Sequence, residues 1–226
     1  EILMDIEKRN PKYHNAQYLL AEIYFIENRT EALRYMGYLD ELGVLEGNYY
    51  LVQLYKLLQG KIPEVKSFLE KFAEKNNTRL SLHLALTEIY TKLGPEQSLM
   101  DTLKKSATIA QGIKQNLIAI DLLKKYIMLA EKKALNPNPI PLQYDIIASS
   151  YEDLGSYHLA LIHVRRAVES AESEKEKDIY RLHEANILRN PTLKRYKDSI
   201  KILHQMQEND PSSPTVYQSM GLTYFM

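Results

Sequence analysis

The chain of 226 residues contains no cysteine and no tryptophan, only eight glycines, and no excess of either charge, with 29 basic and 29 acidic residues. Without cysteine there is no disulfide, thiolate nucleophile or cysteine-based metal site. A net charge of zero argues against nucleic acid or an anionic membrane surface as the main partner, since both require a local positive excess. So few glycines also disfavour a β-sandwich with many turns or a glycine-rich nucleotide loop.

Long hydrophobic runs are missing as well. Apolar runs such as Leu117–Ile120 and Ile146–Ala148 are far shorter than the roughly 20 residues that span a bilayer. Charged residues make up 26% of the chain and hydrophobic residues 45%, which is ample for a folded core. The composition therefore predicts a soluble, helical protein of one or two domains that does not insert directly into a membrane.

Motifs for catalysis and metal binding are also absent. The six histidines include no His-x-x-x-His pair, and the metalloprotease pattern that begins at His183-Glu184 lacks its second histidine. Neither Gly-x-x-x-x-Gly-Lys nor Gly-x-Gly-x-x-Gly occurs. Glu152-Asp153 is interpreted as solvated charge near a turn. We therefore expect no enzyme, no catalytic residue, no metal and no cofactor.

A regular pattern is present near the middle of the chain. Tyr144, Ala148 and Tyr151 are spaced as one stripe of a helix. Gly155 supplies the conformation that a helix end needs, and a second amphipathic segment with the small residue Ala160 follows. Ala148 and Ala160 would let two helix backbones approach closely. This pattern resembles the tetratricopeptide repeat, a helix–turn–helix unit of about 34 residues.

The pattern recurs along nearly the whole chain. The residues that share the eleventh position of the repeat are Tyr24, Tyr55, Tyr90, Tyr151 and Tyr224. The first two intervals between them, 31 and 35 residues, each hold one repeat, whereas the 61 residues from Tyr90 to Tyr151 hold one repeat and an additional helix. The interval from Tyr151 to Tyr224 holds two repeats, of which the inner one begins with the weakly matching helix 175–188.

The additional helix sets the predicted domain organisation. We expect an N-terminal sub-array at 1–112, a joint at 113–139, and a C-terminal sub-array at 140–226. The joint consists of a long helix at 113–135 and the proline-rich breaker Asn136–Pro139. Because Gly221–Met226 continues an apolar helical pattern without a stop signal, we expect the second sub-array to be a truncated part of a longer protein.

The resemblance implies an all-α fold, a right-handed superhelical solenoid of antiparallel helix pairs, in which the first helix of each pair lines the concave face. The residues that the resemblance places on this face are Asn15, Tyr18, Glu22, Phe25, Tyr49, Gln53, Lys56, Glu88, Asp145, Ser149, Glu152 and Gln218. This lining is mixed and lacks the Lys/Arg/Asn clamp with which chaperone-binding members of the family hold acidic peptide tails.

The resemblance favours a non-enzymatic scaffold or adaptor that binds an extended peptide or a helix of another protein on its concave face. An alternative is a sensory or regulatory segment of a longer multidomain enzyme or signalling protein. A third is a structural solenoid that self-associates through exposed edges, including the C-terminal helix. Fold alone does not decide among these interpretations.

Overall fold

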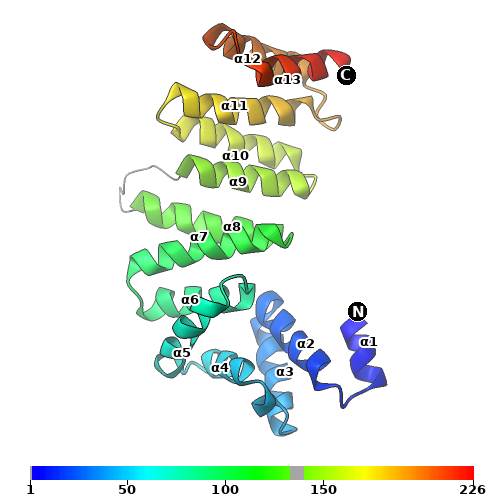
Figure 1. Ribbon diagram of the computed structural model, residues 1–226, viewed down its shortest axis with the longest axis vertical. Coiled ribbons are helices and arrows are strands. Elements are labelled where there is room, and N and C mark those ends of the chain that lie inside the picture. The colour runs from blue at the N-terminus through cyan, green and yellow to red at the C-terminus, as the bar shows by residue number, and fades with distance from the viewer. Residues whose placement is uncertain (1, 133–139) are drawn as a thin grey trace. The chain divides into compact units, whose positions relative to one another are not determined.

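The computed structural model describes residues 2–132 and 140–226, and these residues form thirteen α-helices and one short 3₁₀ helix, without a strand (Figure 1). The expected all-α class is therefore confirmed. The proline-rich breaker Asn136–Pro139, part of the predicted joint, lies outside the described residues.

The helices follow one another with short connections. In chain order they are α1 (Ile2–Arg9), α2 (His14–Glu27), α3 (Arg29–Glu41), the 3₁₀ helix η1 (Leu45–Gly47), α4 (Tyr49–Leu58), α5 (Ile62–Lys75), α6 (Leu80–Leu93), α7 (Glu96–Gly112), α8 (Asn116–Lys132), α9 (Ile140–Asp153), α10 (Tyr157–Ser170), α11 (Glu174–Arg189), α12 (Tyr196–Asn209) and α13 (Pro214–Phe225).

The chain divides into two compact units, Glu1–Ile109 and Ala110–Met226, and the boundary falls within the last turn of α7. The helix predicted at 113–135 is α8, which belongs to the second unit and packs against α9. The separate joint and the domain limits derived from the sequence stay predictions.

In the first unit, each helix from α1 to α6 packs against the next, and α2 also contacts α4 and α6. Asparagines start two of these helices. The Asn28 side chain accepts hydrogen bonds from the backbone of the first turn of α3, and Asn48 does the same for α4. Such caps satisfy backbone N–H groups that have no partner inside the helix. They therefore fix where the second helix of the first pair and the first helix of the next pair begin.

In the second unit, the pair α9 and α10 has the packing that the sequence pattern predicts. Ala148 and Ala160 are both fully buried and belong to one hydrophobic cluster with Val164 and Ala167. The turn between the two helices contains Gly155 with a φ of +69°, a conformation that glycine adopts without strain. The resemblance to the tetratricopeptide repeat is thus confirmed at the level of the helix pair. Figure 1 shows α9, α10 and α11 as successive layers of this unit.

Four of the five repeated tyrosines pack as half-buried residues, whereas Tyr224 is 66% exposed. Tyr24, Tyr55 and Tyr90 lie against the core of the first unit and Tyr151 against that of the second. The Tyr90 hydroxyl donates a hydrogen bond to Glu70 Oε1 at 3.0 Å, and burial together with this carboxylate raises the pKa of Tyr90 to about 12. The rings thus fill space between helices while the hydroxyls reach polar groups.

A substitution of Ala160 tests the close contact between α9 and α10. Replacing it by Leu should lower the free energy of unfolding by about 1–3 kcal/mol, because the larger side chain does not fit the fully buried contact with α9. The change Leu159→Ala, at the exposed neighbouring position, should have a clearly smaller effect in the same urea denaturation experiment. Equal effects of the two substitutions would show that the register of α10 is wrong.

Candidate functional site on the first helices

The sequence-predicted binding residues lie on the first helices of the pairs, and the environments of these residues differ between the two units. Those on α2, α4 and α6 belong to the first unit, and those on α9 and α13 belong to the second. Their role in binding a partner stays a prediction, whereas the structure shows which of them are accessible.

On the first unit, two of the predicted residues are core residues. Phe25 is fully buried and Gln53 is only 3% exposed. Both were expected to line an open concave face, and this expectation is wrong. The physical reason is that α2 packs directly against both α4 and α6, so side chains on this side of α2 and α4 meet the protein itself.

A hydrogen-bond network links α2, α4 and α6 on the same side. The Ser81 hydroxyl donates to Glu22 Oε1, and the Tyr50 hydroxyl lies 2.8 Å from Ser81 Oγ. Because the single hydroxyl hydrogen of Ser81 is directed at Glu22, Tyr50 is the donor in its contact with Ser81. The Arg79 Nε lies 3.2 Å from Glu22 Oε1, and its guanidinium lies over the Tyr50 ring, 4.8 Å from the ring centre. The carboxylate of Glu22 is thus already bound by Ser81 and Arg79.

A second cluster holds Glu88. The Arg29 guanidinium lies 3.4 Å from the centre of the Phe25 ring, and its Nη2 is 3.9 Å from Glu88 Oε2. Lys92 Nζ lies 3.2 Å from the other carboxylate oxygen of Glu88. Burial lowers the pKa of Arg29 to about 10, and the attraction of Glu88 opposes this shift. The guanidinium remains charged at neutral pH and neutralises a second acidic residue of the predicted face.

The remaining predicted residues of the first unit are partly accessible. The Tyr18 hydroxyl donates to the Val44 carbonyl oxygen at 2.6 Å. Asn15 and Tyr49 are exposed, and Lys56 is half-buried. Of the predicted residues on this unit, Asn15 and Tyr49 alone are therefore exposed.

On the second unit, α9 presents its predicted residues along one stripe. Asp145 and Glu152 are directed at the same side chain, His183 of α11. His183 Nδ1 lies 2.5 Å from Asp145 Oδ1, and His183 Nε2 lies 2.5 Å from Glu152 Oε2. A carboxylate only accepts hydrogen bonds, so both ring nitrogens must carry a proton, and His183 is an imidazolium. Burial opposes this charge, but the hydrogen bonds to the two carboxylates raise the pKa of His183 to about 9.

This arrangement corrects one interpretation of the sequence. Glu152 was expected to be a solvated charge, but it is half-buried and binds His183. Asp153 is exposed, as expected for a solvated charge, and its Oδ2 lies 2.8 Å from Lys114 Nζ. The partners of His183 are 38 and 31 residues away along the chain, so no local motif reveals these contacts.

The first-helix face of the second unit also includes residues that the sequence analysis did not identify. Ile179, Leu182, His183 and Asn186 recur at helical spacing on α11 and therefore form one stripe. Ile179 is 62% exposed. This helix matches the repeat pattern weakly, but the spacing of its apolar residues is a signal that could have found the stripe.

The predicted face also includes residues of α13, a helix that α11 contacts. Arg189 Nη1 of α11 donates to the Ser219 carbonyl oxygen of α13 at 3.3 Å, which joins the two helices. Gln218 is exposed and Leu222 is 49% exposed. We name this surface the second-unit face, and it comprises Leu142, Asp145, Ser149, Glu152, Ile179, Leu182, His183, Asn186, Gln218 and Leu222.

Nowhere in 2–132 and 140–226 do three or more histidine, aspartate or glutamate side chains come together in a way that could hold a metal ion. His183 illustrates why, since its two ring nitrogens point to two separate carboxylates and leave no position that all three groups could share.

None of the described helices combines the length and the apolar character that crossing a membrane requires.

Comparison with known proteins gives likenesses of fold only. No protein-family model and no curated protein matches the chain. A chain in the crystal structure of the Cut9–Hcn1 hetero-tetramer of the APC/C is similar over 98% of this chain, with 12% identity and a TM-score of 0.46, and this chain spans 51% of its length. A Podospora anserina putative kinesin light chain with nearly identical TPR-like repeats is similar over 88% of this chain and 97% of its own, with 14% identity and a TM-score of 0.48.

A substitution of Ser81 tests whether its hydrogen-bond network stabilises the first unit. The substitution Ser81→Ala should lower the free energy of unfolding by about 1–3 kcal/mol, because it leaves the Tyr50 hydroxyl without its buried partner and removes one of the two partners of Glu22 Oε1. The matched change Ser67→Ala, at an exposed position of α5, should stay within about 0.5 kcal/mol. Urea denaturation measures both. If Ser81→Ala lowers the free energy of unfolding no more than its control does, the network does not stabilise the first unit.

The pH dependence of protein stability tests the contacts of His183 on the second-unit face. Its pKa in the folded protein, about 9, is above the ordinary value of 6.5. The stabilisation is therefore complete below pH 6.5 and is lost as the pH rises through 9. Replacing His183 by Gln should lower the free energy of unfolding by on the order of 2–3 kcal/mol at pH 6 and by much less at pH 10.

Urea denaturation at both pH values measures this difference, with the exposed His158→Gln of α10 as the control. A destabilisation by His183→Gln that does not change between pH 6 and pH 10 would contradict a charged, doubly bonded imidazolium.

Proposed function

We propose that the chain is a non-enzymatic protein-interaction module and that its second-unit face binds an extended segment of another protein. The observation that carries the proposal is the contrast between the units. On the first unit this side is filled by Phe25, Gln53 and the network around Ser81. On the second unit the corresponding stripes keep exposed side chains such as Ile179 and Gln218.

The composition of the second-unit face supports a polypeptide as the partner. Leu142, Ile179 and Leu222 are exposed apolar residues on three successive first helices, and such residues contact apolar side chains. Between them, Ser149 and Gln218 offer hydroxyl and amide groups, which serve as donors and acceptors for the main chain of an extended segment. A row of alternating apolar and hydrogen-bonding groups fits a peptide better than it fits a highly charged polymer.

The imidazolium of His183 prepares this face for binding. It neutralises part of the charge of Asp145 and Glu152 and fixes both side chains in one orientation. Side chains that are ordered before binding lose less conformational freedom when a partner arrives. The face is therefore pre-organised, and we expect no strong preference for basic partners on it.

Selection from a random-peptide phage library on the 226-residue chain tests this function. Peptides selected on the wild-type chain should bind the variants Ser149→Arg and Gln218→Arg roughly tenfold or more weakly, because each variant places an unpaired charge and a large side chain in the interface. Gln205→Arg on the exposed surface of α12 is the matched control and should leave binding unchanged.

Fluorescence polarisation of the selected peptides gives the affinities. Peptides that bind all three variants equally, or a selection that enriches no peptide, would contradict the proposal for this face.

A further inference from the structure

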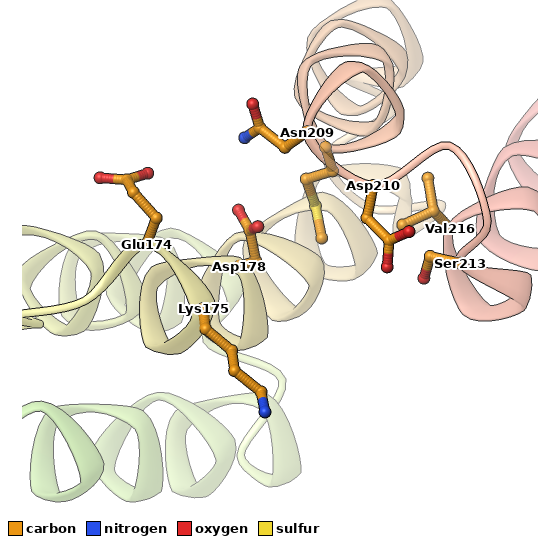
Figure 2. Close-up of a pocket in the computed structure, with 8 residues that line it drawn as sticks. Glu174, Lys175, Asp178, Asn209, Asp210, Ser213 and Val216 are labelled. Atoms are coloured by element: carbon orange, nitrogen blue, oxygen red, sulfur yellow. The ribbon is translucent and has the colours of Figure 1, made fainter.

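The two carboxylates of α11 that line the pocket shown in Figure 2 are already paired with basic residues of the same helix. Glu174 lies 2.9 Å from Lys177, and Asp178 lies 2.9 Å from Arg181. In the first unit, by contrast, two buried donors are left over. Gln53 Nε2 of α4 and Arg29 Nη1 at the start of α3 make no hydrogen bond to any of the described residues.

Helices α2 and α6 contact each other although they belong to the first and the third helix pair of this unit. The first helix of the pair between them, α4, has 10 residues, whereas α2 and α6 have 14 residues each. At a rise of about 1.5 Å per residue, α4 is too short to separate its neighbours along their whole length. The contact between α2 and α6 is therefore additional to the packing of each helix against the next.

Two polar bridges connect α2 and the start of α3 with α6. In the first bridge, the Glu22 carboxylate accepts a hydrogen bond from Ser81 and lies 3.2 Å from Arg79 Nε. In the second bridge, Arg29 Nη2 lies 3.9 Å from Glu88 Oε2. The bridges reach α6 two turns apart, roughly 10 Å along its axis. We name the five residues Glu22, Arg29, Arg79, Ser81 and Glu88 the clasp.

The ion pairs of the clasp are accessible to solvent. The side chains of Arg79 and Arg29 are 41% and 37% exposed. The separation of 3.9 Å between Arg29 and Glu88 is too long for a hydrogen bond, so this pair is held by the attraction of the two charges. Accessible ion pairs of this kind contribute little to stability, and salt screens them. The clasp is therefore a weak contact.

The arrangement with the clasp formed leaves hydrogen-bonding capacity unused. Gln53 is only 3% exposed, and a buried donor without an acceptor destabilises a fold by more than a formed hydrogen bond stabilises it. Separation of α2 from α6 would let the donors of Gln53 and Arg29 reach an acceptor. It would also expose Phe25, which is fully buried with the Arg29 guanidinium over its ring. Burial of Phe25 therefore keeps the unit closed while no partner covers this ring.

We propose that the clasp is a releasable contact and that the first unit opens between α2 and α6 to admit an extended segment of another protein. The groups that opening uncovers define the chemistry of this segment. Its main-chain carbonyl oxygens accept from Gln53 and Arg29, and an apolar side chain covers Phe25. An extended segment suits these donors because its carbonyl groups are not used in hydrogen bonds of its own. The inference goes beyond the proposed function because the clasp shares no residue with the second-unit face.

The distance between α2 and α6 tests the opening. Because the chain contains no cysteine, spin labels can be attached at Glu27→Cys on α2 and Leu93→Cys on α6, both exposed positions. Double electron–electron resonance should give a shorter and a longer distance, and the fraction of the longer one should rise between about 0.1 M and about 1 M NaCl, because salt screens the clasp. Labels at Leu19→Cys and Leu33→Cys, exposed positions within the pair α2 and α3, should give a distance that does not change with salt.

The variant Glu22→Gln/Glu88→Gln removes both negative charges of the clasp and keeps the donors of Arg29 and Gln53. It should raise the ratio of the longer to the shorter distance by roughly threefold or more. The matched control Glu64→Gln/Glu74→Gln, at two exposed positions of α5, changes the net charge equally and should leave this ratio unchanged. The salt titration needs no substitution in the clasp, so it decides the question if the variant does not fold.

Selection from a random-peptide phage library on the Glu22→Gln/Glu88→Gln chain tests the partner. The selected peptides should bind this variant roughly threefold or more tightly than they bind the wild type, because the wild-type chain must first open. They should also increase the fraction of the longer distance. Gln53→Leu, which removes the buried donor, should weaken their binding by about fivefold.

A single distance that changes neither with salt nor in the double glutamine variant would overturn the clasp. Peptides that bind the wild type and this variant equally, peptides whose binding does not depend on Gln53, or a selection that enriches no peptide would overturn the assignment of the partner. Peptides selected for the second-unit face should bind the clasp variants as they bind the wild type, so the proposed function is measured separately.

Discussion

The structure depends on one constraint: each helix pair among the described residues leaves apolar surface that neighbouring helices must cover. The Ala148–Ala160 crossing closes the interior of one pair, but the outer sides of that pair must be covered by the helices that precede and follow it. Stability is therefore shared between neighbours, as in other linear arrays. In the first unit this cover extends further, since α6 contacts α2 as well as α5.

The same constraint explains which parts could be predicted from the sequence. The helix pair around Gly155 was predictable because its determinants lie within one pair: helical spacing, small residues at the crossing and a glycine with positive φ at the turn. Helix α11 was also predictable as a helix. Its stripe with Ile179 was not recognised as part of a face, since its residues depart from the repeat pattern at the positions that identify the other first helices.

The accessibility of the predicted face depends on distant contacts and could not be read from local spacing. Phe25 occupies a position that the resemblance places on the surface, and it is buried because α2 packs against α4 and α6. Ser81 reaches Glu22 across 59 residues of sequence. Glu152 was interpreted as solvated for the same reason, because its partner His183 lies on a helix two elements further along the chain.

The His183 imidazolium has a mechanical consequence for the second unit. Packed helices commonly deform by sliding along one another through small distances. Asp145 and Glu152 hold the ring from two sides, seven residues apart on α9, a separation of roughly 10 Å along the helix axis. Sliding of α11 along α9 in either direction pulls the ring away from one carboxylate and pushes it toward the other. Shear between these two helices is therefore resisted in both directions.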